Sequence, residues 1–239
     1  KYYIEVGTIP LAAFGMALTL YISTLVASPI LLAIIFLFFG FFGGMFIVPL
    51  NALIQFNAKK KVLGTILAGN NWFHSVSMFL MLGMTTIVSY YGFDPLKTIY
   101  LILLITLIGT MYTIYQLPQS LILLFLKTIV GMKYKLEVNG ITNIPQTGGV
   151  LLLGNHISWI DWAVVLMAVP REVKFVMDKT IYNKWYLKWL LKMFKAIPIS
   201  NASSKSTIQI IAKELDAGHM VVVFPEGSIT RNGHLGEFK

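Results

Sequence analysis

Four long apolar stretches occupy the first half of the chain and constrain its fold more than any other feature. They cover residues 4–26, 30–53, 62–90 and 96–117. A helix needs about 20 predominantly apolar residues to cross a bilayer, because its backbone polar groups have to be paired within the segment. Each stretch reaches that length. The sequence therefore predicts four membrane-spanning helices joined by short connections.

The composition agrees with a membrane protein and excludes several kinds of site. Of the 239 residues, 56% are hydrophobic and only 12% are charged, whereas soluble domains carry about 25% charged residues. The net charge of +9 suits either nucleic acid or an anionic membrane surface. The apolar stretches favour the membrane, so no nucleic-acid partner is expected. Because cysteine is absent, disulfides, thiolate nucleophiles and cysteine-based metal sites are excluded.

Lysine residues in the short connections predict the orientation of the spans. Residues 59–61 are three consecutive lysines, whereas the connection at residues 27–29 carries no charge. Short loops rich in Lys and Arg are usually cytoplasmic. With four spans, everything after residue 117 is then expected on the same cytoplasmic side.

A few polar residues interrupt the predicted spans, namely Asn51, Asn70, Asn71 and His74. Such residues are costly in lipid and usually face the interior of a helix bundle or a water-filled cavity. Asn70, Asn71 and His74 share one face of a helix and are candidates for a transport path for a polar head group. The alternative is that they form hydrogen bonds between helices.

The second half of the chain has a different pattern, typical of an α/β domain. The apolar run at residues 121–126 is too short to cross a membrane, and we expect an interfacial linker helix over residues 118–132. Short apolar runs at residues 149–154 and 220–224 predict buried strands, and Ile208, Ile211 and Leu215 recur at helical spacing between them. Each predicted strand ends at a polar motif.

The first of these motifs contains a histidine and an aspartate with a spacing that suits acid–base chemistry. His156 follows the first strand, and Asp161 lies five positions later. If His156 lies in the turn and Asp161 in the next helical turn, the carboxylate can orient the imidazole, which then acts as a general base on a hydroxyl. The second motif contains Glu226, Gly227 and Arg231, a pattern that suits phosphate binding.

Residues 41–55 resemble the late spans of bacterial lysophospholipid transporters of the major facilitator superfamily, and residues 70–71 and 78–83 are similar too. This resemblance implies that residues 1–117 are the last four helices of such a transporter. A transport path would then be incomplete in this part of it.

The motifs of the second half resemble those of lysophosphatidic acid acyltransferase-like glycerolipid acyltransferases. The similar segments are residues 155–161, 174–179, 196–200 and 224–231, in that order, and the resemblance extends over about residues 136–239. It implies acyl transfer from an acyl thioester, either coenzyme A or acyl carrier protein, to the hydroxyl of a lysophospholipid. No covalent acyl-enzyme, bound cofactor or metal is implied. His156 would be the general base and Asp161 its partner.

The same resemblance implies roles for six further residues. The residues that would position or support the substrate are Asn155, Ser158, Lys179, Glu226, Gly227 and Arg231. Ser200 and Ser228 stand where many members have arginine. Because arginine binds phosphate in a bidentate manner, its absence favours a phosphodiester acceptor over a phosphomonoester.

The segment 224–230 is similar to 2-acylglycerophosphoethanolamine acyltransferases, which in some bacteria are fused behind a lysophospholipid transporter. This predicts a multi-span α-helical membrane bundle at residues 1–117, the linker at 118–132, and an α/β acyltransferase domain at 133–239, truncated at its C-terminus. The chain would lie in the bacterial inner membrane, with acyl carrier protein as a partner. The alternative is a lysophospholipid transporter with a non-catalytic lipid-binding cytoplasmic domain.

A row of lysines, Lys184, Lys188, Lys192 and Lys195, lies beside two tryptophans, Trp185 and Trp189. A helix with this pattern is suited to lie on anionic lipid. The alternative is a solvated basic face over a buried apolar one.

Overall fold

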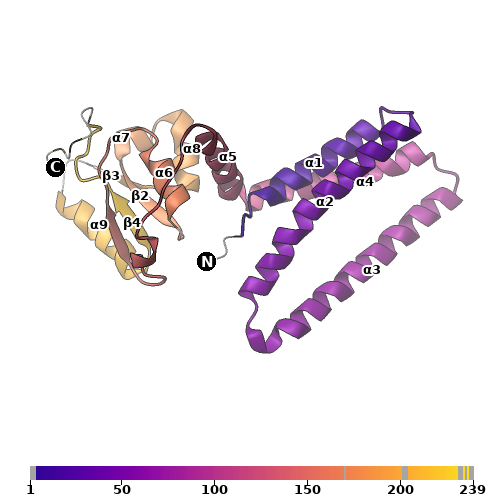
Figure 1. Ribbon diagram of the computed structural model, residues 1–239, viewed down its shortest axis with the longest axis horizontal. Coiled ribbons are helices and arrows are strands. Elements are labelled where there is room, and N and C mark those ends of the chain that lie inside the picture. Colours follow the sequence, from indigo (N-terminus) through magenta and orange to yellow (C-terminus); the bar gives the residue numbers. More distant parts are fainter. Residues whose placement is uncertain (1–3, 170, 201–203, 231–233, 235, 237–239) are drawn as a thin grey trace. The chain divides into compact units, whose positions relative to one another are not determined.

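The structure is a computed structural model that describes residues 4–169, 171–200, 204–230, 234 and 236. It divides into two compact units, Lys1–Leu124 and Phe125–Lys239 (Figure 1). The first is helical. The second is a small α/β unit, as the change of sequence pattern predicts.

Proline and aspartate define where the helices of the first unit begin. Pro29 and Pro95 stand in the first turn of their helices, where the missing N–H leaves no hydrogen bond unmade. The Asp94 carboxylate accepts a hydrogen bond from the backbone N–H of Leu96 at 2.9 Å and caps the helix that begins at Pro95. The four long helices are α1 (Thr8–Ser23), α2 (Pro29–Asn57), α3 (Leu63–Tyr90) and α4 (Pro95–Gln116).

Three of these helices are long and apolar enough to cross a membrane, namely α2, α3 with the turn before it, and α4. The first predicted span is shorter than expected, because α1 has only 16 residues. At 1.5 Å per residue it extends over about 24 Å, less than the hydrocarbon core of about 30 Å. A fourth crossing, and the assignment to the last four helices of a transporter, stay predictions.

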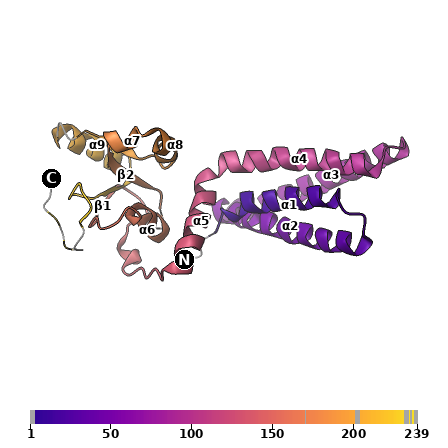
Figure 2. The same cartoon turned by 90° about the horizontal axis from the view of Figure 1, so that it is seen from above.

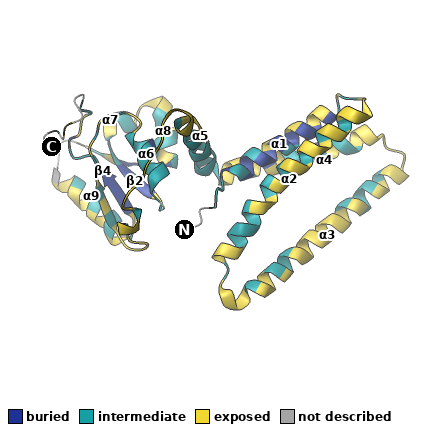
Figure 3. Cartoon of the chain, in the orientation of Figure 1, coloured by how far each residue is buried: buried dark blue, intermediate teal, exposed yellow. Residues whose placement is uncertain are grey.

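Helix α1 packs against both α2 and α4. Ala17 and Leu20 of α1 form a buried cluster with Leu103 of α4. Helices α2 and α3 bury none of their residues, and Figure 3 shows each as a mixture of exposed and intermediate residues. Exposed faces of this apolar composition suit lipid rather than water.

The second unit is organised around a parallel sheet. Its strands are β1 (Val150–Leu153), β2 (Val173–Asp178), β3 (Ile197–Ile199) and β4 (Met220–Val223), in the order β1-β4-β2-β3. Every neighbouring pair is parallel, and Leu153 pairs with Val223. The strands predicted at residues 149–154 and 220–224 are thereby confirmed, and the structure shows that they are direct neighbours.

Helices cover both faces of this sheet. They are α6 (Asp161–Ala168), α7 (Lys179–Tyr182), α8 (Trp185–Met193) and α9 (Ser204–Asp216), while α5 (Pro118–Lys133) precedes the sheet. The chain moves from β1 to β2 through α6 and returns from β3 to β4 through α9. Right-handed crossovers in opposite directions place these helices on opposite faces, as Figure 2 shows. The core contains Val173, Phe175, Met220 and Val222, with Trp162 and Val165 of α6 packed against it.

An ionic cluster joins β2 to α9. Lys174 Nζ lies 2.6 Å from Glu214 Oε2, and His219 Nδ1 lies 2.9 Å from the same oxygen. The hydrogen bond from Lys174, with the charges of Lys174 and His219, holds the pKa of Glu214 below its ordinary value. Lys174 belongs to one of the segments that resemble acyltransferases, and the structure turns its side chain to α9.

We predict that Glu214→Gln flattens the acid side of the stability curve. Because the pKa of Glu214 is lowered on folding, its contribution is complete above the ordinary Glu pKa of about 4.3 and is lost as the pH falls below it. The thermal unfolding midpoint, measured in detergent from about pH 6 to about pH 3, should fall less in this variant. Glu137→Gln, which alters an exposed pair with Lys135, is the control and should keep the wild-type slope. An unchanged slope in Glu214→Gln would contradict the prediction.

Candidate active site

The candidate site lies at the carboxyl ends of β1 and β4. The Gly154 N–H donates to Val223 O at 3.1 Å, which extends the pairing of the two strands by one residue. His156 follows two positions later. After β4 the chain turns, with the Gly227 N–H donating to Phe224 O at 3.1 Å and Gly227 at φ +60°. Because parallel strands end at the same edge of a sheet, both polar motifs meet here.

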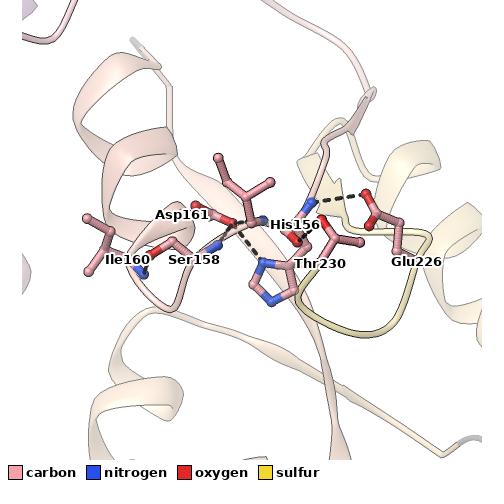
Figure 4. Close-up of polar contacts among 7 residues, drawn as sticks. His156, Ser158, Ile160, Asp161, Glu226 and Thr230 are labelled. Atoms are coloured by element: carbon pink, nitrogen blue, oxygen red, sulfur yellow. Dashed lines mark hydrogen bonds and ion pairs between the residues drawn. The ribbon is translucent and has the colours of Figure 1, made fainter. Parts of the chain in front are cut away.

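One carboxylate oxygen of Asp161 organises the turn that contains His156. Asp161 Oδ2 lies 2.8 Å from His156 Nδ1, and it accepts the backbone N–H groups of Ile157 at 2.8 Å and Ser158 at 2.9 Å (Figure 4). Asp161 is also the first residue of α6. The turn, the helix start and the imidazole are therefore held by a single group.

This contact assigns the tautomer of the imidazole. A carboxylate oxygen that already takes two backbone N–H groups acts as an acceptor, so in a neutral imidazole we assign the proton to Nδ1 of His156 and the lone pair to Nε2. In Figure 4, Nε2 lies on the side of the ring away from Asp161. The ring stacks on Phe224, with centroids 4.6 Å apart and planes at 21°. Contacts on one edge and one face thus fix its orientation.

Hydrogen bonds also hold the backbone of His156. Glu226 Oε1 accepts the His156 N–H at 3.1 Å, and the Thr230 N–H donates to His156 O at 2.8 Å. Glu226 is only 1% exposed, and its Oε2 has no hydrogen-bond partner among the described residues. The motif after β4 therefore holds the motif after β1 directly.

A cavity of about 570 Å³ opens beside His156. Its walls are mainly apolar and include Trp159, Trp162, Met177 and Ile181. Few polar side chains line it, and one is Asp178. Apolar pockets of this size with a few convergent polar groups suit a ligand with an alkyl part.

Asp178 brings a negative charge to this cavity. Its carboxylate accepts hydrogen bonds from both the backbone N–H and the hydroxyl of Thr180, at the start of α7. These bonds hold the pKa of Asp178 below its ordinary value, with the hydroxyl of Thr180 as the largest cause. The carboxylate is therefore ionised at neutral pH.

The other residues predicted for the site lie in different places. Gly227 lines the cavity, whereas Glu226 is buried behind the turn and is not part of the lining. Ser158 Oγ accepts the Ile160 N–H at 3.4 Å. Asn155 and Lys179 are exposed, and Lys179 does not line the cavity. Arg231 lies outside the described residues.

The candidates for a transport path divide into two groups. Asn70 Nδ2 lies 3.4 Å from Asn51 Oδ1 and joins α3 to α2 by a long hydrogen bond. Asn71 and His74 are exposed on α3. The contact between Asn51 and Asn70 favours the hydrogen-bonding interpretation for this pair. A transport path stays a prediction.

Three residues of the site were not singled out from the sequence, namely Asp178, Phe224 and Thr230. Asp178 stands two positions before Thr180, a spacing typical of a helix N-cap. Phe224 and Thr230 lie in the motif after β4, but their contacts with His156 depend on how the two strands pair. In the part of the chain that the structure describes, no three metal-ligating side chains gather.

Comparisons with known proteins agree with the division of the chain. Residues 135–239 match the model of a protein family described as Acyltransferase. The chain is 26% identical to the chloroplastic 1-acyl-sn-glycerol-3-phosphate acyltransferase LPAT1 of Arabidopsis thaliana over 110 residues, 44% of this chain and 31% of the relative. It is 27% identical to the 1-acyl-sn-glycerol-3-phosphate acyltransferase of Pseudomonas aeruginosa over 116 residues, 47% of this chain and 44% of the relative.

A separate similarity concerns the N-terminal region. Here the lysophospholipid transporter LplT of Photorhabdus laumondii is 40% identical over 73 residues, 30% of this chain and 17% of the transporter. The chain spans less than half the length of each of these three relatives. No solved structure is significantly similar to it. Residues 135–239 thus match the Acyltransferase family model, and the similarity of the N-terminal region to lysophospholipid transporters is consistent with a fused transporter and acyltransferase.

Proposed function

We propose that this protein transfers a fatty acyl group from an acyl thioester to the free hydroxyl of a lysophospholipid, with His156 as the general base. The observation that carries the proposal is the contact between His156 Nδ1 and Asp161 Oδ2 at 2.8 Å, beside an apolar cavity. The similarity to acyltransferases supports the reaction class. The donor is acyl carrier protein or coenzyme A.

The proposed chemistry needs one proton acceptor at Nε2 of His156. This nitrogen takes the proton of the acceptor hydroxyl as its oxygen attacks the thioester carbonyl carbon. Asp161 stabilises the resulting imidazolium through Nδ1–H. The tetrahedral intermediate then expels the thiolate by breaking the C–S bond, and the imidazolium returns its proton to the sulfur. No acyl group is attached to the protein at any step.

Glu226 has a positioning role in this proposal. It is buried and accepts the backbone N–H of His156, so it acts on the substrate through the turn. Gly227 and Ser228 line the cavity, and in this proposal they contact the acceptor head group. Asn155 and Ser158 support the turn, and Lys179 and Arg231 are candidates for phosphate contacts.

The acceptor we propose is a phosphodiester with a cationic head group, such as a lysophosphatidylethanolamine. The ionised Asp178 lines the cavity and repels a doubly charged phosphomonoester while it attracts an ammonium group. The missing arginines at Ser200 and Ser228 support the same choice. Under this proposal the transporter to which the helical unit belongs moves the lysophospholipid inward across the bacterial inner membrane, and the acyltransferase domain works on the cytoplasmic side.

We predict that His156→Ala abolishes turnover. Loss of the general base should lower kcat by about 10³-fold, within the range for acid–base catalysis, as measured by acylation of lysophospholipid by the chain reconstituted in vesicles. His219→Ala removes a histidine that directly precedes β4 and pairs with Glu214, and it should keep near wild-type turnover. Wild-type kcat in His156→Ala would refute the mechanism.

Glu226 offers a test of positioning against direct substrate binding. Glu226→Gln keeps an oxygen that accepts the His156 N–H, so kcat should stay within about threefold of wild type. Glu226→Ala leaves this N–H unpaired and should lower kcat by about 30-fold or more with little change in KM. A raised KM for the acceptor with unchanged kcat in either variant would show instead that Glu226 binds the head group.

Acceptor choice should depend on the charge of Asp178. Asp178→Asn keeps a side-chain oxygen for the cap on Thr180 and removes the negative charge. The ratio of kcat/KM for lysophosphatidylethanolamine to that for lysophosphatidic acid should fall about fivefold, from a Coulomb interaction of about 1 kcal/mol. Asp216→Asn, at the end of α9, is the control. An unchanged ratio in Asp178→Asn would mean that this carboxylate does not select the acceptor.

A further inference from the structure

Helix α8 exposes aromatic side chains that the packing of its unit does not use. Trp185 is 86% exposed and Trp189 is 61% exposed. Tyr186 is half-exposed, and its ring contacts Trp185 edge-on with centroids 5.8 Å apart. Large aromatic rings on a protein surface usually mark a binding site, and tryptophan is typical of the membrane–water interface.

The geometry of the helix places the two tryptophan rings on its outward face. Phe194, at the end of α8, is buried. Its ring packs against the Trp162 ring of α6, with centroids 6.0 Å apart. Leu187 and Leu190 share that inward face, since they lie seven and four positions before Phe194. Trp185 and Trp189 are four positions apart and lie together on the opposite side. One face of α8 thus packs against its own unit, and the opposite face is exposed.

A row of lysines accompanies the two tryptophans. Lys184, Lys188 and Lys192 are spaced by four residues and are exposed, so they form one stripe beside the rings. Residues 179–200 contain five lysines and no acidic residue. Lys195 pairs with Glu172, whereas the three lysines of the stripe have no ion pair within the described ranges. Their charges are available to a partner.

We infer that this outward face of α8, formed by Trp185, Trp189 and the three lysines, binds the surface of a membrane that contains anionic lipids. Indole rings lie well among lipid head groups, and lysine side chains extend past them to lipid phosphates. An acidic protein would match the lysines, but the two exposed indoles favour lipid. The inference concerns binding and does not depend on acyl transfer.

The location of α8 gives this binding a consequence for the site. Only two residues separate α8 from α7, whose Ile181 lines the cavity beside His156. The turn after β1 also exposes the apolar side chains of Ile157, Trp159 and Ile160. Trp159 belongs to the cavity wall as well. A lipid-bound α8 would keep this apolar opening close to the membrane from which a lipid acceptor comes.

The absence of cysteine allows a direct test. A polarity-sensitive fluorophore is attached at Tyr186→Cys, and the full chain is reconstituted in phosphatidylcholine vesicles with about 30% phosphatidylglycerol and a doxyl-labelled lipid. The label should lose about half of its emission by contact quenching. The same label at Lys213→Cys, on the exposed side of α9, should lose less than about a tenth.

Further variants separate the contributions of rings and charges. In the Tyr186→Cys background, changing Trp185 and Trp189 to Ser should reduce quenching at least about threefold, and vesicles without phosphatidylglycerol should reduce it too. Adding His156→Ala should leave quenching unchanged, which separates this result from any failure of the proposed reaction. Equal quenching at both labelled positions, or none at Tyr186→Cys, would overturn the inference. A label that responds to acyl carrier protein but not to doxyl lipid would assign the face to an acidic protein and overturn it as well.

Discussion

The Oδ2 oxygen of Asp161 accepts hydrogen bonds from one imidazole and two backbone N–H groups, and the rest of the site depends on this arrangement. The backbone bonds close the turn after β1 and bring the chain to the start of α6. The same bonds fix the carboxylate, so that it meets the Nδ1 edge of His156. A base whose orienting group is held by the backbone needs little rearrangement when it takes up a proton. The same carboxylate oxygen therefore determines both the shape of the turn and the orientation of the imidazole.

The pairing of β1 with β4 supplies the second half of the arrangement. These strands are neighbours in the sheet although nearly 70 residues separate them in the chain. Their adjacency places Phe224 against the imidazole and lets Glu226 and Thr230 hold the backbone of His156. The motif after β4 thus holds both the ring and the backbone of His156. The connection from β3 to β4 runs back across the sheet, in the direction opposite to the connection from β1 to β2. It therefore places β4 between β1 and β2.

How much could be predicted from the sequence follows from the range of the interactions. The strands at residues 149–154 and 220–224, and the helix that contains Ile208 and Leu215, reflect local periodicity and were predictable. The length of α1 was not, because the apolar stretch at residues 4–26 continues past the ends of the helix, which begins at Thr8 and ends at Ser23. The contact of Glu226 with the His156 N–H was also not predictable, because the direction of the side chains after β4 depends on the register of the strands. The cavity wall comes from α6, β2 and α7 together, and no local pattern describes such a surface. The catalytic roles of His156 and Asp161 stay predictions.

The burial of Glu226 has a consequence for how this domain balances folding against activity. A carboxylate that is 1% exposed, with one oxygen lacking a partner among the described residues, is an unfavourable group to place in a protein interior. Selection for stability alone would favour an apolar side chain of similar volume there. The carboxylate therefore marks a position where the domain gives up folding free energy to keep a turn in shape. An apolar replacement at this position would fill the core, but it would also remove the hydrogen bond that Glu226 accepts from the His156 N–H.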